Sequence, residues 1–278
     1  MLIDCNIGHL ILNYEELSFN AHPSLQTQFY DGWVLRFAHG YTKRANSISP
    51  LYPSELDLRP DSISPLYSSK FDLQTKIAEC EKRYFEQGLM AAYKLTEITD
   101  PDIDKLLEER GYERRDITYV MEMDLTNKEF PMTNCESFSI VNHADEEWLN
   151  AHFSLREYAD KAKMPIAKQI FENVKNPMMF GRIVKDGKTA ACGQVVIERG
   201  YATLQNVAVD LTRRRQGFGK KICELLLSEA KRRGAFTVCL QTEIENVEAV
   251  NLYKKLGFNT VYSYWYRVKK GEMNNEKF

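Results

Sequence analysis

The segment VAVDLTRRRQGFGKK (207–221) decides the fold, because it is typical of a strand that ends in a tight turn and leads into a helix. Gly217 and Gly219 stand where the helix begins, and five of the nine residues 213–221 are cationic. The first N–H groups of a helix have no partner within it, and glycines let a ligand approach the backbone closely. The pattern predicts a site for a diphosphate, held by backbone donors and basic side chains. Taken alone, it also fits an ordinary helix start.

The residues on both sides of this segment predict an α/β fold, in which helices and strands follow one another and three consecutive strands form a meander. Alternating apolar residues indicate strands, and apolar residues at helical spacing that end at a glycine indicate helices. The expected elements are a strand at 137–142, a helix at 146–162, three strands over 178–210 that turn at Asp186-Gly187 and Arg199-Gly200, a helix at 217–233, a strand at 235–243, a helix at 247–257 and a strand at 260–268.

A faint internal repeat predicts that the two halves of the chain share one fold. Shifting the sequence by 146 positions aligns residues 88–112 with 234–258, and six of these 25 positions are identical. The first half also repeats the order of elements, with a helix at 74–87, a strand at 90–96, a helix at 101–110 and a strand at 116–125. We therefore expect two domains, 1–130 and 131–278, joined by the polar segment 127–137.

A second, local repeat lies in the first half. SISPLYPSELDL (47–58) recurs as SISPLYSSKFDL (62–73), with nine of twelve positions identical. Serine, proline and aspartate favour turns over helices, and a unit of this length is too short to pack by itself. We expect a duplicated surface loop, and a lid over the substrate is the alternative.

Composition excludes several classes of protein. The net charge of -2 argues against a dedicated nucleic-acid binder, and no apolar run is long enough to span a membrane. The N-terminus lacks the basic region of a signal peptide, and the six cysteines are scattered, as in a reduced cytoplasmic protein. The five histidines show no metal-ligand spacing, so no metal is expected.

Two motifs resemble the signatures of the GNAT superfamily of acyl-CoA-dependent N-acyltransferases. The first, [R/Q]-x-x-G-x-[G/A], is matched by Arg214, Gly217 and Gly219. The second, N-x-x-A-x-x-L-Y-x-x-x-G-F, is matched without a gap by Asn246, Ala249, Leu252, Tyr253, Gly257 and Phe258. The resemblance covers about residues 137–268. It implies two tandem GNAT-like domains, each with a mixed, mostly antiparallel, splayed sheet flanked by helices. It also implies acetyl-CoA or another acyl-CoA as donor.

The resemblance also implies roles for individual residues. Backbone groups of Val207 and Val209 would bind the pantetheine arm, and a strand N–H such as that of Val207 would stabilise the oxyanion. Tyr253 would protonate the leaving thiolate, although helical spacing alone favours a core aromatic. The expected cofactor-binding residues are Val207, Ala208, Val209, Arg214, Arg215, Gln216, Gly217, Phe218, Gly219, Lys220, Asn246 and Tyr253.

The general base is less well defined. Some family members carry a glutamate where this chain has Thr203, with Gln205 on the same face. Glu198 and Glu243 are the remaining candidates, and each would act through water. Both also fit a solvated or structural carboxylate. The acceptor is expected to contact residues 150–165, whose polar choices are His152, Arg156, Glu157 and Tyr158.

The first half resembles a degenerate copy. At the offset of 146, Leu107 stands in the place of Tyr253, and Phe71 and Leu73 replace the two glycines, so we expect no cofactor there. The segment 31–47 resembles the N-terminal half of some two-domain bacterial GNAT proteins. We expect it to pack with partial substrate contact, and closure over the acceptor cleft is the alternative. Its polar residues include Arg36, Lys43, Arg44 and Asn46.

The sequence therefore predicts an N-acyltransferase that moves an acetyl or other short acyl group to a primary amine. The acceptor would be a small metabolite or a peptide, and the enzyme a cytoplasmic monomer or homodimer without nucleic-acid or membrane partners. The alternative is a non-catalytic acyl-CoA-binding sensor or assembly module.

Overall fold

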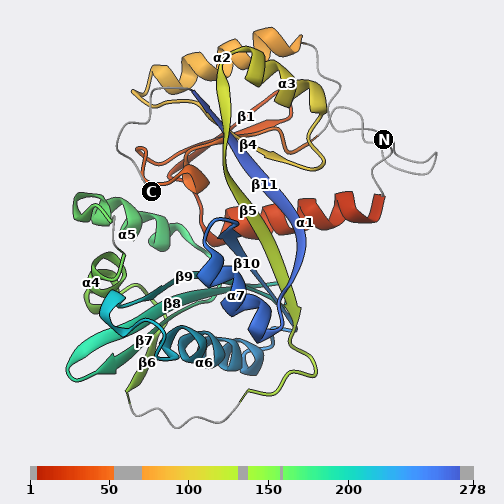
Figure 1. The fold of residues 1–278 in the computed structure, drawn as a ribbon. Helices are drawn as coiled ribbons and strands as arrows, with labels where there is room; N and C mark the ends of the chain where they lie inside the picture. The colour runs from red at the N-terminus through yellow and green to blue at the C-terminus, as the bar shows by residue number, and fades with distance from the viewer. Residues whose placement is uncertain (1–4, 53–70, 131–136, 157–158, 270–278) are drawn as a thin grey trace. The chain divides into compact units, whose positions relative to one another are not determined.

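The computed structural model describes residues 5–52, 71–130, 137–156 and 159–269 (Figure 1). These residues belong to two compact units. The first unit comprises residues 1–16, 24–118 and 262–278, and the second comprises residues 17–23 and 119–261. Most of the duplicated loop, residues 53–70, lies outside the described residues, as do residues 131–136 of the predicted linker.

The second unit contains the sheet predicted around the glycine motif. Its strand order is β5-β10-β9-β8-β7-β6. β9 and β10 are parallel, whereas the β6–β7, β7–β8 and β8–β9 pairs are antiparallel. The strands are β6 (Phe138–Val141), β7 (Met178–Lys185), β8 (Lys188–Glu198), β9 (Tyr201–Val209), β10 (Thr237–Glu243) and the later part of β5 (Tyr112–Asp124). The helices are α4 (Glu146–Ser154), α5 (Met164–Asn173), α6 (Phe218–Arg232) and α7 (Val247–Leu256).

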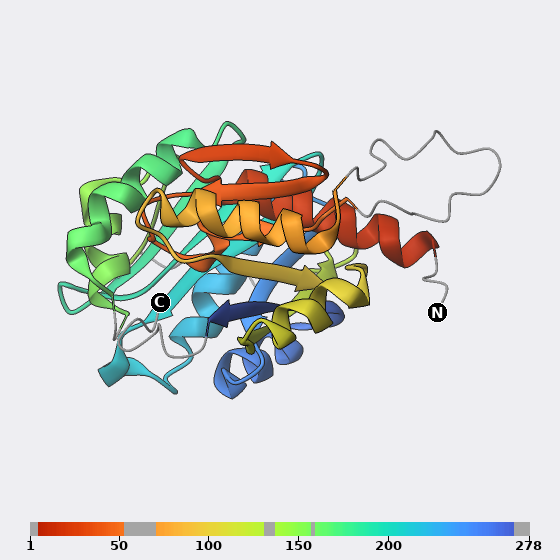
Figure 2. The ribbon, with the colours of Figure 1, turned by 90° about the horizontal axis from the view of Figure 1, so that it is seen from above.

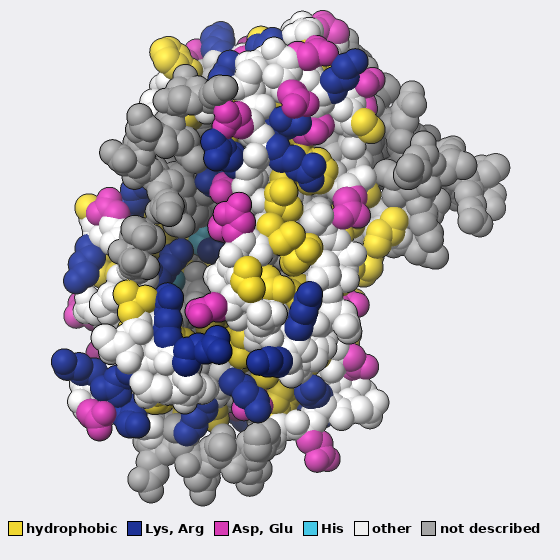
Figure 3. All heavy atoms as spheres, in the orientation of Figure 1, with side chains coloured by type: hydrophobic (Ala, Val, Ile, Leu, Met, Phe, Trp, Pro, Cys, Tyr) yellow, Lys and Arg dark blue, Asp and Glu magenta, His cyan; other side chains and the backbone are white. Residues whose placement is uncertain are grey.

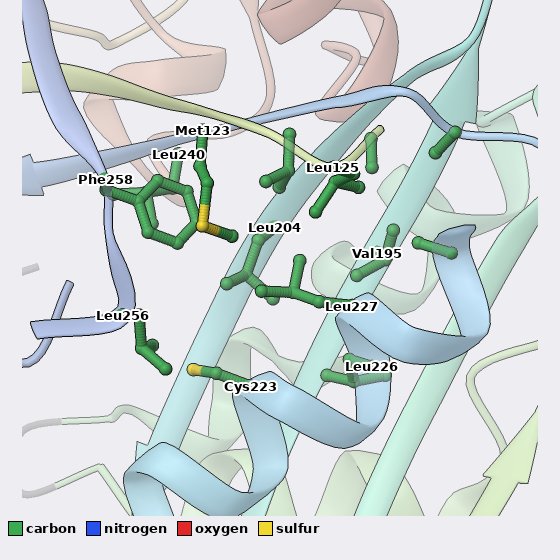
Figure 4. Close-up of a cluster of buried hydrophobic side chains, with 14 of the residues drawn as sticks. Met123, Leu125, Val195, Leu204, Cys223, Leu226, Leu227, Leu240, Leu256 and Phe258 are labelled. Carbon is green, nitrogen blue, oxygen red and sulfur yellow. The ribbon is translucent and has the colours of Figure 1, made fainter. Parts of the chain in front are cut away.

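The core of this unit lies between α6 and the sheet. Leu226 and Leu227 of α6 pack against Val195 of β8 and Leu204 of β9 (Figure 4). On the opposite face, the buried Trp148 of α4 donates from its indole Nε1 to two strand carbonyl oxygens, each at 3.2 Å. Both faces of the sheet are therefore covered, which explains the continuous apolar character of β8.

Two glycines allow α6 to lie close to the sheet. Gly181 of β7 and Gly193 of β8 are paired in the register, and both face Leu226. A Cβ atom at Gly181 would lie 2.9 Å from Leu226 Cδ2, and one at Gly193 would lie 2.8 Å from Leu226 Cδ1. These distances are shorter than a van der Waals contact, so neither position accepts a side chain unless Leu226 or its helix moves.

We expect Gly193→Ala to lower the free energy of unfolding by about 1–3 kcal/mol, the range typical of an overpacked core. Urea denaturation measures this, and the matched control is Gly8→Ala, since a Cβ at Gly8 meets nothing within 4 Å. Adding Leu226→Ala should remove part of the clash, so the two effects should be less than additive. Strict additivity would contradict the close contact between Gly193 and Leu226.

The first unit is built around a sheet of order β1-β2-β3-β4-β11-β5. Its core is formed by α2, α3 and one face of the sheet, with Leu35, Ile48 and Leu95 contributed by three neighbouring strands. Figure 2 looks down onto the two helices. The remaining elements are α1 (Cys5–Ala21), β1 (Gln26–Tyr30), β2 (Trp33–Phe37), β3 (Ile48–Ser49), α2 (Leu73–Phe85), β4 (Ala92–Thr96), α3 (Pro101–Glu109) and β11 (Asn259–Lys269).

The spacing of elements agrees with the offset of 146. Adding 146 to the bounds of α2, β4, α3 and β5 gives the bounds of α6, β10, α7 and β11 to within one residue. The predicted mixed α/β fold class is confirmed. The division into domains at residues 130 and 131 stays a prediction.

The structure differs from the sequence prediction in three places. The helix expected over 146–162 ends at Ser154, and a short 3-10 turn at Lys161–Lys163 precedes the unpredicted α5. The long helix α1 was not predicted, since no acidic residue marks its first turn and no basic residue its last. The strands β1, β2 and β3 were not assigned either, because they are short and β1 is largely polar and exposed.

Candidate active site

The two central strands of the second unit separate at the predicted motif. β9 and β10 pair in parallel from Tyr201 and Thr237 to Leu204 and Leu240. Beyond these residues the two strands continue to Val209 and Glu243 but no longer pair with each other. On its other side, β9 stays paired with β8 up to Val209. At the end of β9, the backbone N–H and C=O groups that face β10 are therefore not bonded by that strand. An extended ligand can form hydrogen bonds with them.

A bulge redirects β9 at this point. Asn206 has a φ angle of 56°, and the register of β8 and β9 shifts between Cys192 and Gln194. The Asn206 side chain donates to Gln194 Oε1 at 2.6 Å and holds the bulge in place. Asparagine tolerates left-handed backbone better than most residues, which suits it to this position. In the sequence, only the turn preference of asparagine marks this position, and nothing marks Gln194.

The glycines at the start of α6 serve two different purposes. Gly217 is the N-cap residue with a φ angle of 86°, and a Cβ there would meet nothing within 4 Å, so the helix start is open above it. Gly219 is packed instead, because a Cβ there would lie 3.2 Å from Leu252 Cδ2 and 3.5 Å from Val209 Cγ2. Arg215, with a φ angle of 62°, contributes to the turn that exposes the first amides of the helix.

The cationic side chains around this turn are weakly paired. Arg214 and Arg215 both approach Glu248, at 4.0 and 3.9 Å, and both are at least half exposed. Such exposed pairs contribute little to stability, so the two guanidinium groups can reorient towards an anion. Figure 3 shows several Lys and Arg side chains on the lower half of the face, where α6 and α7 lie in Figure 1.

Tyr253 lies on α7 and packs against Phe258, with ring centroids 5.8 Å apart. Its side chain is 8% exposed, and burial raises the pKa of its hydroxyl well above the ordinary value. The hydroxyl is therefore protonated at neutral pH.

The other residues of the second motif hold α7 in place. Asn246 is the N-cap residue, and its Oδ1 accepts from the N–H of Ala249 at 3.1 Å. Gly257 ends the helix with a φ angle of 103°. Ala249 and Leu252 pack against the core of the unit. The motif thus fixes both ends of the helix that carries Tyr253.

The two candidate bases lie in different surroundings. The Glu198 carboxylate, at the end of β8, accepts from Asn20 Nδ2 at 3.0 and 3.1 Å and from Asn176 Nδ2 at 3.1 Å. Glu243 is exposed at the end of β10. Thr203, where some relatives of this superfamily carry a glutamate, is buried with its hydroxyl 3.6 Å from Cys239 Sγ.

The expected acceptor-side residues are brought together only in part. His152 is buried and stacks on Trp148, with ring centroids 4.9 Å apart. Arg156 Nη1 lies 3.5 Å from His152 Nε2. Glu157 and Tyr158 lie outside the described residues.

The described residues contain no group of three or more His, Cys, Asp or Glu side chains placed to hold a metal ion. Within the same residues, every helix is too short or too polar to cross a membrane.

Comparison with known proteins identifies the family. The family model "Probable histone acetyltransferase Rv0428c C-terminal" matches residues 10–267, and the chain belongs to this family. The uncharacterized N-acetyltransferase YobR of Bacillus subtilis (strain 168) is 26% identical over 266 residues, which cover 94% of this chain and 99% of YobR. The chain is thus a GNAT-family N-acetyltransferase, as the two motifs predicted.

Two further similarities are found, one over part of the chain and one over nearly all of it. The [ribosomal protein bS18]-alanine N-acetyltransferase of Escherichia coli (strain K12) is 38% identical over 78 residues, which cover 28% of this chain and 53% of that enzyme. A GCN5-related N-acetyltransferase from Kribbella flavida shares the fold, with a TM-score of 0.64 and 14% identity over 94% of this chain and 95% of that chain.

Proposed function

We propose that the enzyme transfers an acetyl group from acetyl-CoA to a primary amine by direct attack of the amine on the thioester. The observation that carries this proposal is the open start of α6 at Gly217, beside the end of β9 that β10 no longer pairs. The open start of α6 fits a diphosphate, and the end of β9 fits a pantetheine arm. Other short acyl groups are compatible with the same contacts.

The donor would lie along the end of β9 and the start of α6. The amides of residues 215–220 would bind the diphosphate, with Arg214 and Arg215 turning from Glu248 to the phosphate oxygens. The backbone groups of Val207 and Val209 would bond the pantetheine arm as an added strand would. Phe218, Ala208, Gln216 and Lys220 complete the proposed donor site.

The chemistry then needs an oxyanion donor and an acid. The N–H of Val207 would stabilise the tetrahedral oxyanion, because the bulge at Asn206 turns the strand just before it. Tyr253 would give its proton to the leaving thiolate, since burial keeps its hydroxyl protonated. Asn246 would serve the donor site by starting the helix of Tyr253.

The amine must lose a proton before it attacks. Glu198 and Glu243 stay the proposed acceptors of that proton, each through water. Three hydrogen bonds from amide groups fix the position of the Glu198 carboxylate. Glu243 is exposed to solvent, which would carry the proton away.

The first unit is proposed to bind no donor. Its helix α2 corresponds to α6, but Asp72 caps the N-terminus, and its Oδ1 accepts from the N–H of Thr75 at 2.9 Å. The carboxylate occupies the donors that a phosphate would use and repels its charge. Leu107, in the place of Tyr253, is buried and carries no proton to donate.

The acceptor is proposed to be the amine of a peptide or a small metabolite. The relative that acts on alanine of ribosomal protein bS18 makes an N-terminal peptide amine the first candidate. The test is release of the coenzyme A thiol from acetyl-CoA in the presence of a panel of amines that includes peptides with free or blocked N-termini. We expect free amines to accelerate release and blocked ones to have no effect. If no amine changes the rate, the proposed transfer is wrong.

A further inference from the structure

One face of the sheet in the first unit is polar and nevertheless buried. The opposite face packs under α2 and α3 with apolar residues such as Leu35, Ile48 and Leu95. Strand alternation therefore places the intervening side chains together on the other face. Each of these is at most 5% exposed: Arg36, Ser47, Ser49, Lys94, Tyr264 and Tyr266.

The strand register makes these groups neighbours. The N–H of Arg36 donates to the Ser47 carbonyl oxygen at 3.1 Å across β2 and the residue before β3. Ile48 of β3 pairs with Tyr93 of β4, so the side chains next to them, Ser49 and Lys94, lie on the same face. Lys94 is in turn paired with Tyr266 of β11. The polar groups thus cross four adjacent strands in a row.

Three hydroxyl groups of this face lack hydrogen-bond partners. They belong to Ser47, Ser49 and Tyr266, and their oxygen atoms are buried without a bond to any residue in the described ranges. A buried hydroxyl without a partner destabilises a fold, and most such groups in proteins are satisfied. Three on one small surface point to a bound group that supplies the missing acceptors.

Cationic side chains gather on and beside this face. Lys94 is paired with Glu15 of α1, whose other oxygen accepts from Tyr262 at 2.8 Å. Arg36, next to it, lies in surroundings that lower its pKa to about 10, because burial removes it from water. Arg44 adds a further positive charge, which also lowers the pKa of Arg36 and the pKa of Lys94.

The loop after β2 is built to hold Arg44 near this face. Asn46 Oδ1 accepts from the N–H groups of Ala38 at 2.7 Å and Gly40 at 3.0 Å. Its Nδ2 donates to the Thr42 carbonyl oxygen at 2.8 Å. The Arg44 carbonyl oxygen accepts from the guanidinium of Arg36. The loop and the strand face therefore form one preorganised cationic surface.

We propose that this face binds a small oxyanion, a carboxylate or phosphate group, through the hydroxyls of Ser47 and Ser49 and the guanidinium of Arg36. An oxyanion accepts several hydrogen bonds, and its negative charge suits the guanidinium of Arg36. The site lies within the first unit and involves none of the residues proposed to bind acetyl-CoA. It gives the first unit a ligand of its own, although it has lost the diphosphate motif.

The test uses the double variant Ser47→Ala/Ser49→Ala of the full-length protein, with Ser139→Ala on the exposed part of β6 as the matched control. Inorganic phosphate and acetate are titrated separately by calorimetry in a chloride buffer at constant ionic strength. We expect at least one anion to bind the wild type and the control equally, and the double variant at least about tenfold more weakly. The anion that binds distinguishes phosphate from carboxylate. Equal binding by the double variant, or no binding of either anion to the wild type, would overturn the proposal.

Thermal unfolding separates a binding role from a structural one. Without anion, the double variant should melt at the same temperature as the wild type or higher, since it removes two unsatisfied buried hydroxyls. With a saturating anion, the wild type should be raised in Tm and the double variant should not. Tyr266→Phe, which also deletes a buried hydroxyl, should likewise keep its Tm without anion. Its rise in Tm with anion should be smaller than that of the wild type. A Tm lowered equally in both conditions would assign the hydroxyls a structural role and contradict the site.

Discussion

In the Gly217→Glu variant, we expect the affinity for coenzyme A to fall at least about a hundredfold, which corresponds to about 2.7 kcal/mol. The residue lies at the open start of α6, where an added side chain meets no protein atom and projects towards the proposed diphosphate. The new carboxylate would accept from the same first-turn amides and repel the phosphates. Isothermal titration calorimetry with coenzyme A measures the loss.

The control for this variant lies at the other end of the same helix. Gly234 also has a positive φ angle, of 93°, and a Cβ there meets nothing within 4 Å. Gly234→Glu therefore introduces the same charge and a similar backbone strain of roughly 1–2 kcal/mol, but far from the proposed phosphates. It should bind coenzyme A as the wild type does. If both variants lose affinity together, strain and not the phosphate site explains the effect.

We expect Tyr253→Phe to lower kcat by about 10²–10⁴-fold, the usual contribution of a general acid, with little change in the affinity for coenzyme A. The substitution removes only the hydroxyl and leaves the ring in contact with Phe258. Steady-state rates combined with calorimetric binding separate the two quantities. An unchanged kcat would exclude Tyr253 as the proton donor.

Tyr119→Phe is the matched control, because Tyr119 packs against the same core and has no proposed role in the reaction. The pH profile gives a second readout. Burial raises the pKa of Tyr253 above its ordinary value near 10, so its acid form is fully present at neutral pH. The wild-type rate should rise with pH as the amine deprotonates. It should not begin to decrease until the pH exceeds about 10.

The sequence predicted the elements whose signals are local. The glycine motif follows β9 and begins α6, the second motif spans α7, and the turns at Asp186-Gly187 and Arg199-Gly200 have positive φ angles. In each case a few adjacent residues determine the backbone. The offset of 146 also located four elements of the first unit to within one residue of their counterparts.

The features that sequence reasoning missed depend on contacts between distant residues. The bulge at Asn206 exists because its side chain reaches Gln194 on the neighbouring strand. Arg36 and Lys94 alternate with apolar residues in their strands, a pattern typical of a solvated face, and yet both are buried. Burial of that face is set by tertiary packing, which the alternation of a single strand cannot report.

The pairing of β11 with β4 has a consequence for biosynthesis. Tyr264 to Val268, close to the end of the chain, pair with Thr96 to Ala92 and belong to the first unit. A ribosome delivers the N-terminal residues of this unit long before its last strand. Until β11 has been synthesised, the β4 edge of the sheet in the first unit therefore has no partner strand. A truncated protein that lacks β11 should keep this open edge and be prone to aggregation.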